Sequence, residues 1–203
     1  VARQLAAGET DIGIVPVAAF LDHDYGIFRG TGIACRGAVR TILLISKVPF
    51  DQIRTLAADA GSRSSVQLTR VILHHRYGAD PVAESRPAEL APMIESADAA
   101  LIIGDPALVL DPVALRQQGF HVADLGEEWM SLTGLPMVFA VWAGDKRLVT
   151  AELEMAFVES YRFGRDHIDE IVAGEHQRRG VTRELAHEYL TRYIVFELGE
   201  EEY

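Results

Sequence analysis

The sequence predicts an α/β fold with parallel strands, on three observations. Segments with strand and helix patterns alternate along the chain, which is typical of α/β sheets. Met137–Trp142 is apolar at every position, as in a parallel strand that is covered on both faces. Hydrophobic residues make up 49% and charged residues 24% of the 203 residues, so the chain can bury a sizeable core.

The first half of the chain combines short apolar strands with helices. Val1–Ala7 has the pattern of the last turns of a helix, with Gly8 at its C-cap, so we expect that elements before it are missing. A second helix begins at Ser64 or Ser65, because apolar residues then recur at helical spacing. Its predicted buried face consists of Leu68, Val71, Ile72 and His75. The predicted strands of this half are Asp11–Val15, Gly32–Cys35 and Val39–Ile45.

The rest of the chain is predicted to contain a further helix, two buried strands and a helical part from Thr150 onward. Pro87 is a favourable first residue for a helix, and Ala99–Ile103 follows that helix as a buried strand. The buried stripe of this helix is Leu90, Met93, Ile94 and Ala97. Beyond Met137–Trp142, the chain from Thr150 onward shows two helical stripes. They are Leu153, Ala156, Phe157 and Tyr161, and Leu185, Tyr189, Tyr193 and Phe196. The acidic segment Glu200–Glu202 is expected to be a solvated end.

Charge and composition exclude several classes of partner. The 19 Lys and Arg against 30 Asp and Glu give a net charge of −11, which argues against a nucleic acid partner. The apolar run Ala99–Ile103 is far too short to cross a bilayer, and no secretory signal pattern opens the chain. The one cysteine, Cys35, cannot form an internal disulfide and is expected to be a small buried hydrophobe. We therefore expect a cytoplasmic protein with a small-molecule ligand and no membrane partner.

The strongest local pattern lies in Gly61–Val66, just before a predicted helix. Small hydroxyl residues at a helix start leave backbone N–H groups pointing outward, where the helix dipole favours an anion. Arg63 adds a positive charge to the serines on either side of it. Simple N-capping by one serine is the alternative interpretation.

Three further turns have residues that suit a ligand. In Arg36–Thr41 a glycine allows close backbone approach and Thr41 offers a hydroxyl. In Ile103–Pro106 the carboxyl end of a strand runs into a Gly-Asp turn, which is where ligands of open α/β sheets bind. Thr133–Pro136 is a short turn that leads into a buried strand. Plain structural turns are the alternative for all three.

Patterns for metals and common cofactors are weak. Asp22-His23-Asp24 lacks a fourth ligand, and His74 and His75 are adjacent, so they do not share a helix face. Gly30-Thr31-Gly32 lacks the third glycine of a dinucleotide-binding turn. We therefore predict no metal and no cofactor. The residues alone predict a cleft that binds a small anion between two α/β lobes, without specifying a reaction.

Taken in order, the turns resemble one family. The resemblance lies in Asp11–Val17, Arg36–Leu44, Ser62–Val66, Asp98–Leu108, and Trp129 with Thr133–Trp142. These segments are similar to the chorismate dehydratases of the futalosine route to menaquinone, over nearly the whole chain. Two departures from the family pattern are Thr41, where relatives often have serine, and the missing N-terminal segment.

The resemblance implies a type 2 periplasmic-binding-protein-like fold, with two lobes and a ligand cleft between them. Residues 1–40 and 135–203 would form one lobe and residues 41–134 the other. A sister branch, the 1,4-dihydroxy-6-naphthoate synthases, has a histidine just after the strand equivalent to Ala99–Ile103. Here Gly104 and Asp105 follow that strand, which favours the dehydratase. A non-catalytic solute-binding or sensor domain of the same fold is a further alternative.

The implied reaction removes water from chorismate to give 3-[(1-carboxyvinyl)oxy]benzoate, with no cofactor. The candidate catalytic residues are Thr41, which would position the departing hydroxyl, and Asp105, which would brace its turn or act as a base. The base could equally be another carboxylate of the enzyme or one of the substrate. The candidate substrate-binding residues are Pro16, Val17, Gly37, Arg40, Ser62, Arg63, Ser64, Ser65, Gly104, Thr133 and Gly134.

Overall fold

Buried apolar strands build two separate sheets in the computed structural model, which describes residues 1–59 and 63–203. The chain divides into two units. The first contains residues 1–36, 135–178 and 182–203, and the second contains residues 37–134 and 179–181. Residues 37–40, which the sequence analysis put in the first lobe, thus lie in the second unit. The reason is local, because the N–H groups of Val39 and Arg40 both bind Asp124 of that unit.

The sheet of the first unit has the strand order β1-β8-β2-β9, and every neighbouring pair is antiparallel. Its strands are β1 (Ile12–Pro16), β2 (Gly26–Cys35), β8 (Met137–Gly144) and β9 (Val195–Glu197). The parallel direction predicted for Met137–Trp142 is therefore wrong. An apolar run predicts that a strand is central in its sheet, but it does not predict the direction of the neighbouring strands. Strand β8 is indeed central, because it pairs with both β1 and β2.

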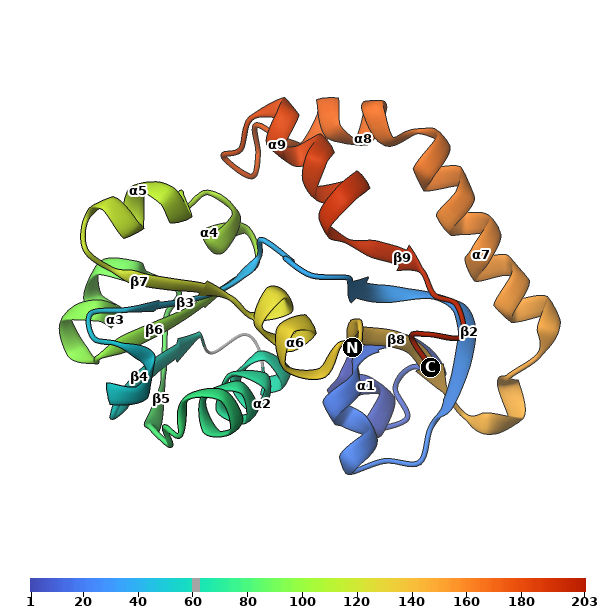
Figure 1. The fold of residues 1–203 in the computed structure, drawn as a ribbon. Helices are drawn as coiled ribbons and strands as arrows, with labels where there is room; N and C mark the ends of the chain where they lie inside the picture. The colour runs from blue at the N-terminus through green and yellow to red at the C-terminus, as the bar shows by residue number, and fades with distance from the viewer. Residues whose placement is uncertain (60–62) are drawn as a thin grey trace. The chain divides into compact units, whose positions relative to one another are not determined.

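Helices of the first unit lie mainly in its C-terminal part. They are α1 (Ala2–Ala6), α7 (Ala151–Asp166), α8 (Ile168–Glu175), α9 (Arg183–Glu188) and the π-helical turn Tyr189–Tyr193, with 3-10 turns at Val17–Leu21 and Lys146–Leu148. Helix α7 packs on the sheet through Phe157, whose ring lies 4.3 Å from Trp142 and 5.6 Å from Phe28, between centroids. Figure 1 shows α7 running beside β2.

The acidic C-terminal segment is a solvated end only in part, because the side chains of Glu200 and Glu201 are exposed whereas that of Glu202 is buried. The guanidinium of Arg36 donates to Glu201 Oε2 and to Glu202 Oε1, each at 2.6 Å. Arg36 follows β2 directly, so these ion pairs fix the segment beside that strand.

The sheet of the second unit has the strand order β5-β4-β6-β3-β7. Its strands are β3 (Ile42–Ser46), β4 (Thr55–Asp59), β5 (Val82–Arg86), β6 (Ala99–Ile103) and β7 (His121–Asp124). Strand β4 is parallel to β5 and β6, whereas β3 is antiparallel to β6 and β7. The core here combines β3 and β6 with Met93, Ile94 and Ala97, as the predicted stripe required.

Helices cover both faces of the second sheet. They are α2 (Arg63–Ile72) with the π-helical turn Leu73–Tyr77, α3 (Leu90–Ser96), α4 (Asp105–Leu108), α5 (Pro112–Gln117) and α6 (Leu125–Thr133), with a 3-10 turn at Phe50–Gln52. Figure 1 shows α2 and α6 on one face, with α3 and α5 on the other. In the described part of the chain, no helix combines the length and hydropathy that a membrane span requires.

Candidate functional site

Several of the predicted turns meet at one edge of the sheet of the second unit. Strands β4 and β6 are parallel and β3 is antiparallel to β6, so the carboxyl ends of β4 and β6 lie beside the amino end of β3. Strand β7 also ends there, because it is antiparallel to β3. Helices α2, α4 and α6 follow β4, β6 and β7, so their first turns lie at the same edge. This edge is the candidate site.

Thr41 and Gly104 are neighbours at this edge. The N–H of Gly104 donates to the carbonyl oxygen of Thr41 at 2.8 Å, just beyond the paired residues Ile42 and Ile103. Gly104 has φ +65° and ψ −146°, a conformation that only glycine adopts readily. Thr41 is 6% exposed, and its hydroxyl donates to Val39 O at 3.5 Å.

Arg40 has an unusual backbone and a buried guanidinium nitrogen. Its φ is +70°, the one positive value of a non-glycine residue in the described chain. Its N–H donates to Asp124 Oδ2 at 2.6 Å, and its Nη2 donates to Leu110 O at 3.0 Å. Its Nη1 is buried and has no hydrogen-bond partner among the described residues. A cationic donor without a partner is costly to bury, so this nitrogen is suited to receive an anion.

The start of α2 adds a second donor group. Ser62 lies outside the described residues, and α2 begins at Arg63, so the first turn contains Ser64 and Ser65. Ser64 Oγ is buried and has no hydrogen-bond partner in the described structure. Ser65 is also buried, and its carbonyl oxygen accepts from the Thr69 hydroxyl at 2.7 Å. The first N–H groups of a helix lack partners within the helix, so this turn can bind an anion.

Asp105 is held by an ion pair. It is the first residue of α4, and its Oδ2 accepts from Arg179 Nη1 at 2.6 Å. Arg179 comes from a segment far along the chain that joins the second unit. Both side chains are about half exposed. Bracing of the Gly104-Asp105 turn, one of the two roles expected for Asp105, stays a prediction.

Thr133 and Gly134 lie at the other end of α6. Eight residues separate Thr133 from the start of this helix at Leu125, which corresponds to about 12 Å at 1.5 Å per residue. The Thr133 hydroxyl donates to Trp129 O at 2.9 Å, and the Gly134 N–H donates to Met130 O at 2.8 Å. With φ +72° for Gly134, these residues close the helix. The structure therefore does not bring them to the edge with Thr41.

The other predicted residues lie in simpler settings. Gly37 has φ +95° in the turn after β2, with open space where a Cβ would lie. Pro16 ends β1 in the first unit. Val17 packs in the first unit against a cluster that includes Val141 and Leu198. A part for Pro16, Val17 and Gly37 in substrate binding remains a prediction.

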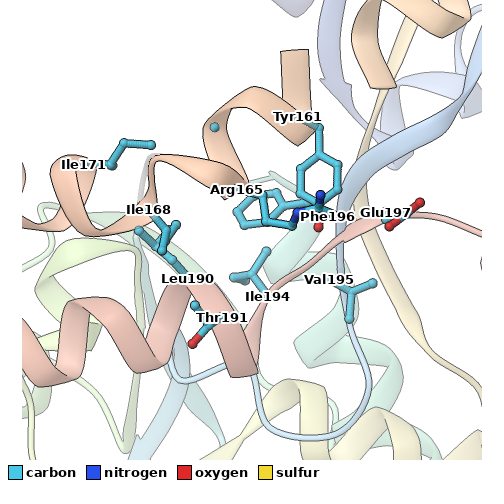
Figure 2. Close-up of a pocket in the computed structure, with 11 residues that line it drawn as sticks. Tyr161, Arg165, Ile168, Ile171, Leu190, Thr191, Ile194, Val195, Phe196 and Glu197 are labelled. Atoms are coloured by element: carbon cyan, nitrogen blue, oxygen red, sulfur yellow. The ribbon is translucent and has the colours of Figure 1, made fainter. Parts of the chain in front are cut away.

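A cavity in the first unit contains none of the predicted site residues. It has a volume of about 620 Å³ and lies between α7, α8, the π-helical turn and β9, as Figure 2 shows. Its lining is mainly apolar, with Arg165 and Glu197 as the charged residues. The apolar side chains are Ile168, Ile171, Leu190, Ile194, Val195 and Phe196. It lacks the buried donors without partners that mark the edge of the second sheet, so we do not assign the anion site to it.

Asp124 connects the segment with Val39 and Arg40 to the start of α6. The sequence analysis did not predict it as a site residue. It is 8% exposed, and its carboxylate accepts from Val39 and Arg40 as well as from the first turn of α6. Burial raises the pKa of the Asp124 carboxyl, although the backbone N–H groups oppose this change by stabilising the charged form.

Among residues 1–59 and 63–203, no group of His, Cys, Asp or Glu is placed to hold a metal ion.

A known protein family matches this chain over its entire given sequence. A family model described as menaquinone biosynthesis matches residues 1–203. The chain belongs to the menaquinone biosynthesis family.

A curated protein is similar to this menaquinone biosynthesis protein along most of its length. The chorismate dehydratase of Thermus thermophilus is 30% identical over 206 residues, which cover 94% of this chain and 75% of that protein.

Solved structures confirm the predicted periplasmic-binding-protein-like fold of this family member. Protein AF1704 from Archaeoglobus fulgidus has a TM-score of 0.68 at 22% identity, over 98% of this chain and 76% of that one. The CA3427 gene product of Candida albicans, described as having the generic periplasmic binding protein fold, has a TM-score of 0.51 at 12% identity. That match covers 96% of this chain and 67% of the other.

Two residues of this menaquinone biosynthesis protein could not be found from local sequence. Asp124 follows the apolar residues of a short strand and precedes a helix, so its sequence context indicates an ordinary N-cap. Arg179 lies 74 residues from its partner Asp105, in a segment without apolar periodicity. Only the folded chain shows that each acts on a turn at the edge of the second sheet.

Proposed function

We propose that this protein is a chorismate dehydratase, which removes water from chorismate to give 3-[(1-carboxyvinyl)oxy]benzoate. The observation that carries the proposal is the 30% identity to the Thermus thermophilus chorismate dehydratase over 94% of the chain. The edge of the second sheet supports it independently, because two of its residues, Arg40 and Ser64, have buried donor atoms without a hydrogen-bond partner in the described structure. The donors alone would indicate an anion site, and the relative supplies the reaction.

The substrate is a dianion, whereas the protein has a net charge of −11. Local donors must therefore outweigh the field of the whole molecule at short range. The Nη1 of Arg40 binds one carboxylate, and the first turn of α2 with Ser64 Oγ binds the other. Ser62 lies outside the described residues, and a part for Ser62 and Arg63 in binding this carboxylate stays a prediction from the sequence.

Thr41 and Asp105 have different roles in the reaction. The hydroxyl of Thr41, close to the Gly104 turn, positions the departing hydroxyl of the substrate. Asp105 braces that turn through its ion pair with Arg179. Because its carboxylate is engaged in this ion pair, Asp105 is poorly placed to take a proton from the substrate. The base is then another carboxylate, either of the enzyme or of the substrate itself.

The chemistry is an elimination without change of oxidation state. The base takes the ring hydrogen beside the enolpyruvyl ether, and the electron pair of that C–H bond delocalises into the conjugated ring carboxylate. The C–O bond to the ring hydroxyl then breaks, and the hydroxide leaves with a proton as water. Aromatisation drives this step. The atoms balance as chorismate to product and one water, so the proposal needs neither a redox cofactor nor a metal.

Turnover of chorismate tests the proposal. Purified protein, dialysed against a chelator and given only chorismate, is expected to form a product lighter by one water, followed by mass and by the absorbance of the new aromatic ring. A boiled sample controls for spontaneous loss of water. Chorismate that binds and is recovered unchanged would contradict the enzyme and favour the solute-binding alternative. Activity that returns only with added metal would contradict the cofactor-free mechanism.

A further inference from the structure

Asp124 is a buried carboxylate that joins two segments of the second unit. It ends β7 and precedes α6. Its Oδ1 accepts from Gly126 N at 3.0 Å and from Glu127 N at 3.3 Å, as an N-cap residue does. The same oxygen accepts from Val39 N at 2.9 Å, and Oδ2 accepts from Arg40 N at 2.6 Å.

Capping a helix does not require the second pair of bonds. Asp111 caps α5 in the same unit, where its Oδ1 accepts from Val113 N at 2.8 Å and from Ala114 N at 3.2 Å. The described hydrogen bonds of Asp111 thus stay within its own helix, whereas those of Asp124 reach a segment 84 and 85 residues away. Asp111 is therefore a matched comparison for the capping role alone.

The bonds from Asp124 hold Arg40 in a disfavoured backbone conformation. A positive φ brings the Cβ of a non-glycine residue too close to its own backbone, and such residues persist only where the surroundings hold them. At φ +70°, the side chain of Arg40 reaches Leu110 O with Nη2 and leaves Nη1 buried without a described partner. The next residue, Thr41, accepts from Gly104.

We propose that Asp124 is a positioning residue of the chorismate site: by binding the N–H groups of Val39 and Arg40, it places the Arg40 guanidinium for the substrate. This inference rests on the proposed function for the identity of the substrate. The conformation of Arg40 itself does not depend on that identity, so the two can fail separately.

Asp124→Asn separates positioning from capping. Asparagine caps helices as well as aspartate does, and its carbonyl oxygen can still accept from Gly126 and Val39. Its amide nitrogen, however, would face the Arg40 N–H as a second donor. We expect kcat/KM for chorismate to fall by about ten- to a hundredfold, mainly through KM, the range for losing a hydrogen bond to a charged group. Asp111→Asn, the control, is expected to leave kcat/KM within about twofold.

A second background tests whether Asp124 acts through Arg40. Arg40→Gly removes the guanidinium and, with it, the need to hold a strained residue, because glycine adopts a positive φ freely. In that background Asp124→Asn is expected to lower kcat/KM by less than about twofold further, since residues that act as a unit are not additive. Equal losses in both backgrounds would overturn the proposal, as would an Asp124→Asn enzyme with the parent's KM.

Amide hydrogen exchange gives a readout that needs no substrate. In the parent protein the Arg40 N–H is expected to exchange slowly, and Asp124→Asn is expected to expose it while the amides of α6 keep their protection. If the parent does not turn over chorismate, the proposed function fails and this measurement still decides whether Asp124 holds Arg40. An Arg40 amide that exchanges equally fast in both proteins would overturn the positioning role.

Discussion

Thr41 shows at the scale of one residue how a buried hydroxyl can serve a site. Its side chain is almost fully buried, and the bond from its hydroxyl to Val39 O, at 3.5 Å, is at the long limit for a hydrogen bond. The hydroxyl also lies beside the Gly104 turn, where the substrate hydroxyl is proposed to leave.

Thr41→Val tests that role. The two side chains have nearly the same shape, so the melting temperature is expected to stay close to that of the parent. Turnover of chorismate is expected to fall by about tenfold or more, the scale of one well-placed hydrogen bond in the transition state. Thr41→Ser, which keeps the hydroxyl, is the control and should retain most activity. A valine variant as active as the parent would remove Thr41 from the site.

Ser64 distinguishes anion binding from helix capping. Its hydroxyl is buried without a partner in the described structure, so Ser64→Ala is expected to weaken substrate binding with little loss of stability. Ser64→Asp adds like charge where a carboxylate is proposed to bind, and should weaken binding by roughly 1–3 kcal/mol in a calorimetric titration. The capping alternative predicts the opposite for Ser64→Ala, namely a stability loss of about 1 kcal/mol with unchanged binding.

Apolar patterns predicted where the buried strands lie in the sequence better than they predicted how those strands pair in the sheets. Strand β6 has the bounds expected for it, Ala99–Ile103, because every residue of that run is apolar and its interior is buried on both faces. Strand β5 could not be predicted, since it lies at the sheet edge and most of its residues are exposed. Strand β9 is only three residues long and follows directly from helical segments.

Helix α2 shows how a correct period can give a wrong face. The predicted face included Val71 and His75, yet Val71 is 40% exposed and His75 is exposed. The buried face instead contains Ser65, Leu68, Thr69, Ile72 and Leu73. Two of these residues are polar, so a pattern that counts only apolar residues centres the face at the wrong position.

Asp98, which directly precedes β6, forms hydrogen bonds to the start of β4 and makes the stability of the second sheet depend on pH. Its carboxylate accepts from Arg54 N and Thr55 N at 2.9 Å, at the start of β4. These bonds, that from Arg54 foremost, hold the pKa of Asp98 below its ordinary value of 3.8. A lowered pKa stabilises the fold above the ordinary value, and this stabilisation is lost as the pH falls through the pKa of the folded state.

Asp98→Asn should therefore make the free energy of unfolding depend less on pH in the acid range. Urea midpoints measured between about pH 6 and pH 3 are expected to fall in the parent and to fall less in the variant, because asparagine has no proton to bind. Asp111→Asn serves as the control for replacing an aspartate that accepts backbone hydrogen bonds, since its described bonds stay within α5 and join no strands. Parallel curves for the parent and Asp98→Asn would contradict this account of Asp98.

At the scale of the whole molecule, an acidic protein is proposed to bind a dianion. The net charge of −11 opposes binding at long range, so the proposed site relies on a few buried donors at one edge of the second sheet. The sequence analysis selected Thr41, Ser64 and Gly104 as candidates, because glycine and hydroxyl residues occur in turns that can approach a ligand, and it selected Arg40 from the same turn as Thr41. It could not find Asp124 or Arg179, whose importance comes from contacts distant in sequence.

A crystal structure with bound 3-[(1-carboxyvinyl)oxy]benzoate tests the central claim most directly. The account predicts one carboxylate within hydrogen-bond distance of Arg40 Nη1 and the other at Ser64 Oγ and the first N–H groups of α2, with the aromatic ring beside Thr41 and Gly104. The result that would contradict it is product bound only in the cavity between α7, α8 and β9, with the donors of Arg40 and Ser64 still without a ligand.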